Sequence, residues 1–247
     1  TGTPADNPAL LTAASLRGLL AERGIVASGG VRTGVAPRAA RTIATVRSPR
    51  LDGIVASMLT VSDNYTAEML VRAVGVAVAG TGTTAAGLRA VVTTLSHLGV
   101  PTAGVALVDG SGLGPQGRVT CAALIAAVDL GDRTGYHALR TGLAVAGRTG
   151  TLALRFVGDP LVGRLRAKTG HIDGVVGLAG VVPTTAGLVR FAFVANGDFS
   201  VSGGEALQDQ IAHLVASYPV VPAPGRLVPG PGVSASAASA RETAPPD

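Results

Sequence analysis

The chain has 247 residues, of which 47% are hydrophobic, with a mean hydropathy of +0.44 and a formal net charge of +5. This length and composition suit one sizeable core or two small ones, and they exclude a chain that is disordered over most of its length. Aromatic residues make up only 3% and the arginines are scattered, so the sequence lacks the stacking platforms and basic stripe that nucleic-acid binding requires.

Helical signals dominate the first half of the chain. A start signal at Asn7-Pro8, leucines at helical spacing and a stop at Gly24 predict a first helix. Apolar residues at helical spacing predict further helices, over residues 49–60, 64–79, 84–98 and 120–129. Cys121, the only cysteine, lies in an apolar run and is predicted to be a small buried residue. A single cysteine excludes an intrachain disulfide.

Strand signals replace helical ones after Gly163. The segments RLRAKTGHI, VVGLAGVV and LVRFAFVAN predict three strands of an antiparallel meander, because they are rich in branched residues and separated by turn formers. A closing amphipathic helix is predicted to end at Pro219, with an apolar face formed by Leu207, Ile211, Leu214, Val215 and Tyr218. Residues 221–247, rich in Pro, Gly, Ala and Ser, predict a disordered tail.

The sequence shows no sign of a membrane span, a signal peptide, a metal site or a nucleotide-binding motif. No run approaches the 18 or so apolar residues of a membrane span, and the N-terminus lacks the layout of a signal peptide. We therefore expect either a cytoplasmic chain or one whose beginning is missing. The histidines at positions 97, 137, 171 and 213 lack ligand spacing, so no metal site is predicted, and there is no P-loop or dinucleotide-binding motif.

A polar cluster, Ser62, Asp63 and Asn64, lies between two predicted helices. These residue types have side-chain oxygens that accept hydrogen bonds from the free N–H groups of a helix's first turn. On its own, the cluster therefore predicts a helix cap.

Lys168 is the only lysine among twenty basic residues. Because arginine fills every other basic position, the retained lysine indicates a chemical role, for which a compact ammonium with an adjustable pKa is needed. Thr169 and Gly170 follow it on a predicted strand. The run Arg148-Thr149-Gly150-Thr151 has a similar pattern, but its flanks favour a turn into the segment LALRF. Lys168 is therefore the preferred candidate.

The order of these motifs resembles a known family. Ser62-Asp63-Asn64 followed by Lys168-Thr169-Gly170 is similar to the second and third motifs of the penicillin-recognising serine acyl-transferases. The phrases SDNYTAEML, VDGSGLGPQGRVT and GRTGTLALRF, in this order ahead of RAKTG, resemble the class C low-molecular-mass penicillin-binding proteins. Those proteins are D-alanyl-D-alanine carboxypeptidases and endopeptidases.

The resemblance implies a fold and a function. The fold is the α/β transpeptidase-like domain of penicillin-binding proteins and β-lactamases, an antiparallel sheet with flanking helices, of which residues 1–220 form the C-terminal part. The function is serine acyl transfer on D-Ala-D-Ala stem peptides of peptidoglycan, with acylation by β-lactam antibiotics and with no cofactor. The location is outside the cytoplasmic membrane, in the periplasm or cell wall. The alternatives are a β-lactamase or esterase of the same fold and a non-catalytic peptidoglycan-binding protein.

The resemblance also assigns roles to five residues. Ser62 passes a proton between a lysine and the leaving amine, and Asn64 holds the substrate's peptide group. Lys168 places a positive charge near the substrate's terminal carboxylate and the Ser62 hydroxyl. Thr169 donates a hydrogen bond to that carboxylate, and Gly170 lets the substrate backbone lie against the strand.

The chain departs from the family pattern in two places. His171 follows Gly170 where the family usually has Ser or Thr; its backbone N–H still serves the oxyanion hole, but the side chain's contact with the substrate carboxylate changes. The Ser-x-x-Lys motif, which carries the family's nucleophile and base, is absent because Lys168 is the only lysine. We therefore expect the chain to be a C-terminal portion that works with a missing N-terminal part of the same protein.

Overall fold

The computed structural model describes residues 6–35, 37–198 and 200–220. The chain divides into two compact units at the boundary between Ser48 and Pro49. The first unit holds the helix α1 (Pro8–Ala21), whose N-terminus is capped by the Asn7 side chain, as predicted. Gly24, with a φ of 76°, follows its end. No residue of α1 is buried.

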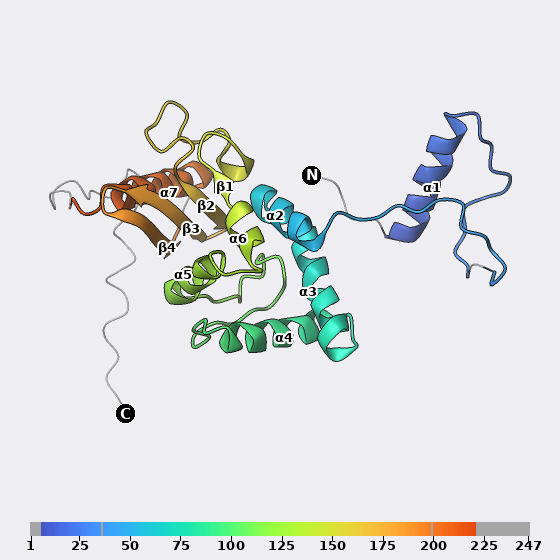
Figure 1. Ribbon diagram of the computed structural model, residues 1–247, viewed down its shortest axis with the longest axis horizontal. Helices are drawn as coiled ribbons and strands as arrows, with labels where there is room; N and C mark the ends of the chain where they lie inside the picture. The colour runs from blue at the N-terminus through green and yellow to red at the C-terminus, as the bar shows by residue number, and fades with distance from the viewer. Residues whose placement is uncertain (1–5, 36, 199, 221–247) are drawn as a thin grey trace. The chain divides into compact units, whose positions relative to one another are not determined.

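The second unit contains the other described elements (Figure 1). Its helices are α2 (Leu51–Val61), α3 (Asn64–Ala79), α4 (Thr84–His97), α5 (Cys121–Leu130), α6 (His137–Thr141), the 3-10 helix η1 (Gly150–Leu152) and α7 (Val201–Ala216). Its strands are β1 (Ala144–Val145), β2 (Arg166–Ile172), β3 (Val175–Thr184) and β4 (Gly187–Asn196). The helices predicted around residues 49–129 and the closing helix are confirmed, with shifts of one or two residues at most of their ends.

The four strands form one antiparallel sheet in the order β1-β2-β3-β4. The predicted three-strand meander is confirmed as β2, β3 and β4. Strand β1 pairs only through Ala144 with Ala167 and Val145 with Arg166. The remaining residues of β2, 168–172, therefore have no strand partner on the side away from β3 among the described residues.

Two helices cover opposite faces of this sheet (Figure 1). Ala212 of α7 belongs to the main apolar core, together with Leu178 and Phe191 of the sheet. Arg190, whose side chain points to the other face because it neighbours Phe191 on β4, forms ion pairs with Asp129 of α5 and Asp132 just beyond that helix. The core thus lies between the sheet and α7, while charged contacts help to hold α5 on the opposite face.

Some sequence expectations are wrong in detail. Cys121 is exposed rather than buried, because it begins α5 directly after the N-cap Thr120 and lies on the side of the first turn away from the core. Tyr218 lies beyond α7, which ends at Ala216, and its side chain is exposed rather than part of the apolar face. The predicted tail, residues 221–247, lies outside the described residues.

No single helix among the described residues is long and apolar enough to cross a membrane. The consecutive helices α3 and α4 meet the criteria of length and composition only as a pair, which is bent by 77°.

Candidate active site

Ser62 and Asp63 occupy the junction of α2 and α3 but have different roles. The Asp63 carboxylate caps α3, accepting hydrogen bonds from the Thr66 N–H at 3.1 Å and the Thr66 hydroxyl at 2.8 Å, and these bonds lower the pKa of Asp63. Ser62 takes the left-handed conformation at the end of α2, with φ 58° and ψ 51°. The capping predicted for this cluster therefore belongs to Asp63, and the Ser62 hydroxyl is free for another contact.

That contact is with Lys168. Its Nζ donates to Ser62 Oγ at 2.7 Å, across 106 positions of sequence, and to the Thr169 carbonyl oxygen at 2.6 Å. The lysine side chain is half-buried, and burial lowers the pKa of Lys168 below that of an exposed lysine. An ammonium with few water contacts and a lowered pKa is suited to exchange a proton with a bonded hydroxyl.

All the residues singled out by the sequence line one cavity of about 380 Å³. They are Ser62, Asn64, Lys168, Thr169, Gly170 and His171. Asn64 is the first residue of α3 and its side chain is exposed, within reach of a bound molecule. The structure thus brings together two motifs that are separated by about a hundred residues of sequence.

Residues 110–113, in the loop that contains the phrase VDGSGLGPQGR, also line this cavity. The Asp109 carboxylate shapes the loop by accepting from the Ser111 hydroxyl at 2.7 Å and the Gly114 N–H at 2.7 Å. Burial alone would raise the pKa of Asp109, but these bonds outweigh it and the pKa is lowered. Glu68 of α3 fastens the loop to the helix, accepting from the Gly110 N–H at 2.7 Å. The sequence indicates a family resemblance for this loop, but it does not predict that Glu68 holds the loop.

A second cavity, of about 690 Å³, adjoins the same strand on the α5 face of the sheet. It shares residues 168–172 with the smaller cavity, and its other walls are largely apolar, including Val108, Leu124, Ala179 and Val194. Among the described residues, no group of three or more His, Cys, Asp or Glu side chains could hold a metal ion.

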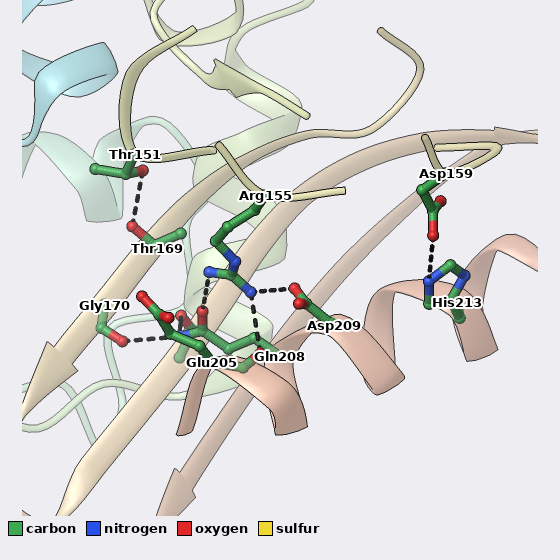
Figure 2. A network of polar contacts seen from close by, with 10 residues as sticks. Thr151, Arg155, Asp159, Thr169, Gly170, Glu205, Gln208, Asp209 and His213 are labelled. Atoms are coloured by element: carbon green, nitrogen blue, oxygen red, sulfur yellow. Dashed lines mark hydrogen bonds and ion pairs between the residues drawn. The ribbon is translucent and has the colours of Figure 1, made fainter. Parts of the chain in front are cut away.

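The competing run at residues 148–151 has a different position. Arg148 is exposed, and it lines neither cavity. Gly150, with a φ of 58°, lies directly against the backbone of Thr60. Thr151, however, accepts a hydrogen bond from the Thr169 hydroxyl at 2.9 Å, as Figure 2 shows. The run is therefore a structural support for β2, and Thr151 is a neighbour of the site that the sequence did not reveal.

The fold, with a lysine at a sheet edge that is hydrogen-bonded to a serine between two helices, is that of penicillin-binding proteins and β-lactamases. Penicillin-binding protein 4 (dacB) from Haemophilus influenzae, solved in complex with a β-lactam, matches with a TM-score of 0.69 and 26% identity, over 87% of this chain and 53% of that one. The predicted fold is confirmed. The sequence matches the D-Ala-D-Ala carboxypeptidase 3 (S13) family over residues 2–218, and the chain belongs to this family.

Curated relatives of this chain include proteins named as carboxypeptidases. A D-alanyl-D-alanine carboxypeptidase from Actinomadura sp. (strain R39) is 37% identical over 237 residues, covering 92% of this chain and 44% of that protein. A carboxypeptidase from Mycobacterium tuberculosis is 36% identical over 169 residues, covering 65% of this chain and 37% of that protein. The chain therefore spans less than half the length of these relatives.

Proposed function

We propose that this chain supplies the substrate-positioning and proton-transfer part of a serine-type D-alanyl-D-alanine carboxypeptidase that acts on peptidoglycan stem peptides. The observation that carries the proposal is the 2.7 Å hydrogen bond between Lys168 Nζ and Ser62 Oγ at the wall of a cavity. Membership of the S13 family and the carboxypeptidases among its relatives support the same reaction.

The nucleophile comes from outside this sequence. A serine activated by a lysine three positions later cannot be formed here, because Leu165 stands three residues before the only lysine, Lys168. The serine is supplied by another part of the same protein. The larger, mostly apolar cavity adjoins Lys168 and offers room for the segment that carries it.

The reaction is acyl transfer in two steps. The serine oxygen bonds to the carbonyl carbon of the penultimate D-alanine, the C–N bond breaks, and the terminal D-alanine leaves with a proton passed on by the Ser62 hydroxyl. Water then cleaves the serine ester and restores the hydroxyl. A β-lactam acylates the same serine by opening its ring, and its leaving nitrogen stays attached to the acyl group.

The free edge of β2 holds the substrate. At residues 168–172 this edge has no strand partner in the part of the chain that the structure describes, and it can accept an extended peptide as an additional strand beside the Lys168 ammonium. The N–H of His171 points to this edge and stabilises the oxyanion. Because peptidoglycan is the substrate, the protein acts outside the cytoplasmic membrane.

Labelling with a fluorescent penicillin tests the proposal. Residues 1–247 alone should form no covalent adduct, whereas the full-length protein should label stoichiometrically, and its Ser62→Ala variant should label at least about 100-fold more slowly. Stoichiometric labelling of residues 1–247 would contradict an external nucleophile.

The same experiment separates the alternatives. A β-lactamase would release the label rapidly with many turnovers, whereas a carboxypeptidase holds it and releases D-alanine from a D-Ala-D-Ala peptide. A non-catalytic peptidoglycan-binding protein would give no adduct at full length and would bind the peptide without cleaving it.

A further inference from the structure

Gln208 of α7 is a buried polar residue that the reaction described above does not use. Its exposed fraction is 1%, and it lies between Gly204 and Ala212 on the stripe of α7 that packs on the sheet. Burial of an amide is costly unless its hydrogen bonds are made. The contacts of Gln208 therefore show what its burial achieves.

The Gln208 amide bridges the two strands at the site. Its Nε2 donates to the carbonyl oxygens of Gly170 at 3.0 Å and Gly177 at 2.8 Å, two residues that are direct partners in the β2–β3 ladder. Both strands lack a side chain at this position, and glycine leaves the backbone more conformational freedom than any other residue. The amide supplies a restraint that the strand pair itself lacks.

Arg155 fixes the orientation of this amide (Figure 2). Its Nη1 donates to Gln208 Oε1 at 2.8 Å, and its Nη2 donates to the Glu205 carbonyl oxygen at 3.1 Å and to the Asp209 carboxylate. A guanidinium can only donate, so the oxygen of the amide must face it and the NH₂ group must face the two carbonyls. The arginine side chain is itself only 12% exposed.

The position of the Gly170 carbonyl determines where the next N–H points. Backbone groups of successive strand residues point alternately to the two sides of the strand. The Gly170 carbonyl lies between β2 and β3, where Gln208 reaches it together with Gly177. The N–H of His171 therefore points to the free edge of β2, the same edge on which the Thr169 carbonyl accepts from Lys168.

We infer that Gln208, oriented by Arg155, is a positioning residue that holds the Gly170–His171 peptide so that the His171 N–H is aimed at the developing oxyanion. The inference rests on the proposed function. It assigns no contact between Gln208 and the substrate. Its effect is on the rate of the covalent step and not on non-covalent binding, because the oxyanion charge develops only after the serine attacks.

The test uses Gln208→Glu in the full-length protein. The carboxylate keeps the length of the side chain and its pairing with Arg155 but, when ionised, cannot donate to the two carbonyls. The first-order acylation constant for a penicillin should fall at least tenfold, while the dissociation constant of the non-covalent complex changes less than twofold. Gln208→Met is apolar and of similar size, so it removes the donor without adding a charge. It should also slow acylation and leave non-covalent binding unchanged, which keeps the test valid if the charge of glutamate distorts the fold.

His213→Gln is the matched control. His213 also joins α7 to the segment before β2, through Asp159 at 3.0 Å, but it has no contact with Gly170. Its acylation constant should stay within twofold of wild type. In residues 1–247, the amide NMR signal of His171 should move in Gln208→Glu and not in His213→Gln.

Failure of the inference and failure of the proposed function give different results. An unlabelled wild-type protein would refute the proposed function, whereas the NMR comparison would still report on the restraint. A wild-type protein that labels, together with a Gln208→Glu variant that acylates at the wild-type rate, would overturn the inference alone. Equal losses in acylation and in non-covalent binding, or an effect in His213→Gln as large as in Gln208→Glu, would reduce Gln208 to a structural role and overturn it too.

Discussion

Replacing Ser62 by glycine and by alanine separates its conformation from its chemistry. Both substitutions remove the hydroxyl that accepts from Lys168, so both lose the same hydrogen bond. They differ in the backbone, because Ser62 has a φ of 58°. The left-handed conformation costs a residue with a side chain roughly 1–2 kcal/mol, and glycine avoids this cost. Glycine, however, loses more conformational entropy on folding, which offsets about 0.5–1 kcal/mol of the gain.

Ser62→Gly should therefore be more stable than Ser62→Ala by about 0.5–1 kcal/mol. For a chain of this size the difference corresponds to about 1–4 °C in Tm, which thermal denaturation of residues 1–247 can resolve. The acylation rate of the full-length protein should fall by at least about 100-fold in both variants, because proton transfer through Ser62 is lost equally.

Two results would refute this reasoning. Alanine and glycine variants of equal Tm would show that the left-handed conformation of Ser62 costs no more than the unfolded-state entropy of glycine, about 0.5–1 kcal/mol. Acylation within twofold of wild type in either variant would show that the Ser62 hydroxyl takes no part in the reaction.

Further outcomes are expected at five positions. Lys168→Arg should lower acylation at least roughly tenfold, about 1.4 kcal/mol, because a planar guanidinium does not fit the contact with the serine hydroxyl, whereas Arg148→Lys should stay within about twofold by stopped-flow measurement. Gly150→Ala should cost about 3 kcal/mol or more in denaturant unfolding, since a Cβ would lie 2.0 Å from a backbone oxygen. In Gly170→Ala the nearest atom to the new Cβ is a backbone oxygen at 3.9 Å, so the variant should keep its stability. It should lose acylation, because the methyl group enters the cavity. Glu68→Gln should lower the free energy of unfolding by about 1 kcal/mol at pH 7. Because the pKa of Glu68 is lowered in the folded protein, this difference should shrink as pH falls and vanish once the wild-type carboxylate is protonated. A constant difference down to pH 3 would contradict the role of the Glu68 carboxylate as a hydrogen-bond acceptor.

The sequence predicted the larger elements of the fold well because each one satisfies a local rule. The helix α3 begins after a capping aspartate and α1 ends near a left-handed glycine, and both signals are visible in the residues themselves. The meander was predicted from branched residues separated by turns. The short elements α6, β1 and η1 carry too few residues for a periodic pattern, so only tertiary contacts define them.

The candidate site was predictable to the extent that it consists of motifs. Ser62 and Lys168 were found by type and order, but the left-handed conformation of Ser62 is set by the junction of two helices and leaves no sequence signal. The sequence did not predict that Gln208 is buried, because Leu207 and Ile211 indicate an apolar face that does not include it. The face of α7 that packs on the sheet instead contains Gly204 and Ala212, whose small size allows a close approach. A polar residue between two small ones on such a face is the signal that could have identified it.

The solitary lysine makes the site chemically addressable. Lys168 provides the only side-chain amine in the sequence, and its lowered pKa leaves a larger neutral, nucleophilic fraction at a given pH than an ordinary lysine has. In residues 1–247, an amine-selective reagent therefore has one side-chain target besides the α-amino group, and that target lies at the wall of the cavity. A peptide bound non-covalently to residues 1–247 shields this amine, so the extent of modification, read by mass spectrometry, is a footprint of site occupancy that needs no engineered label.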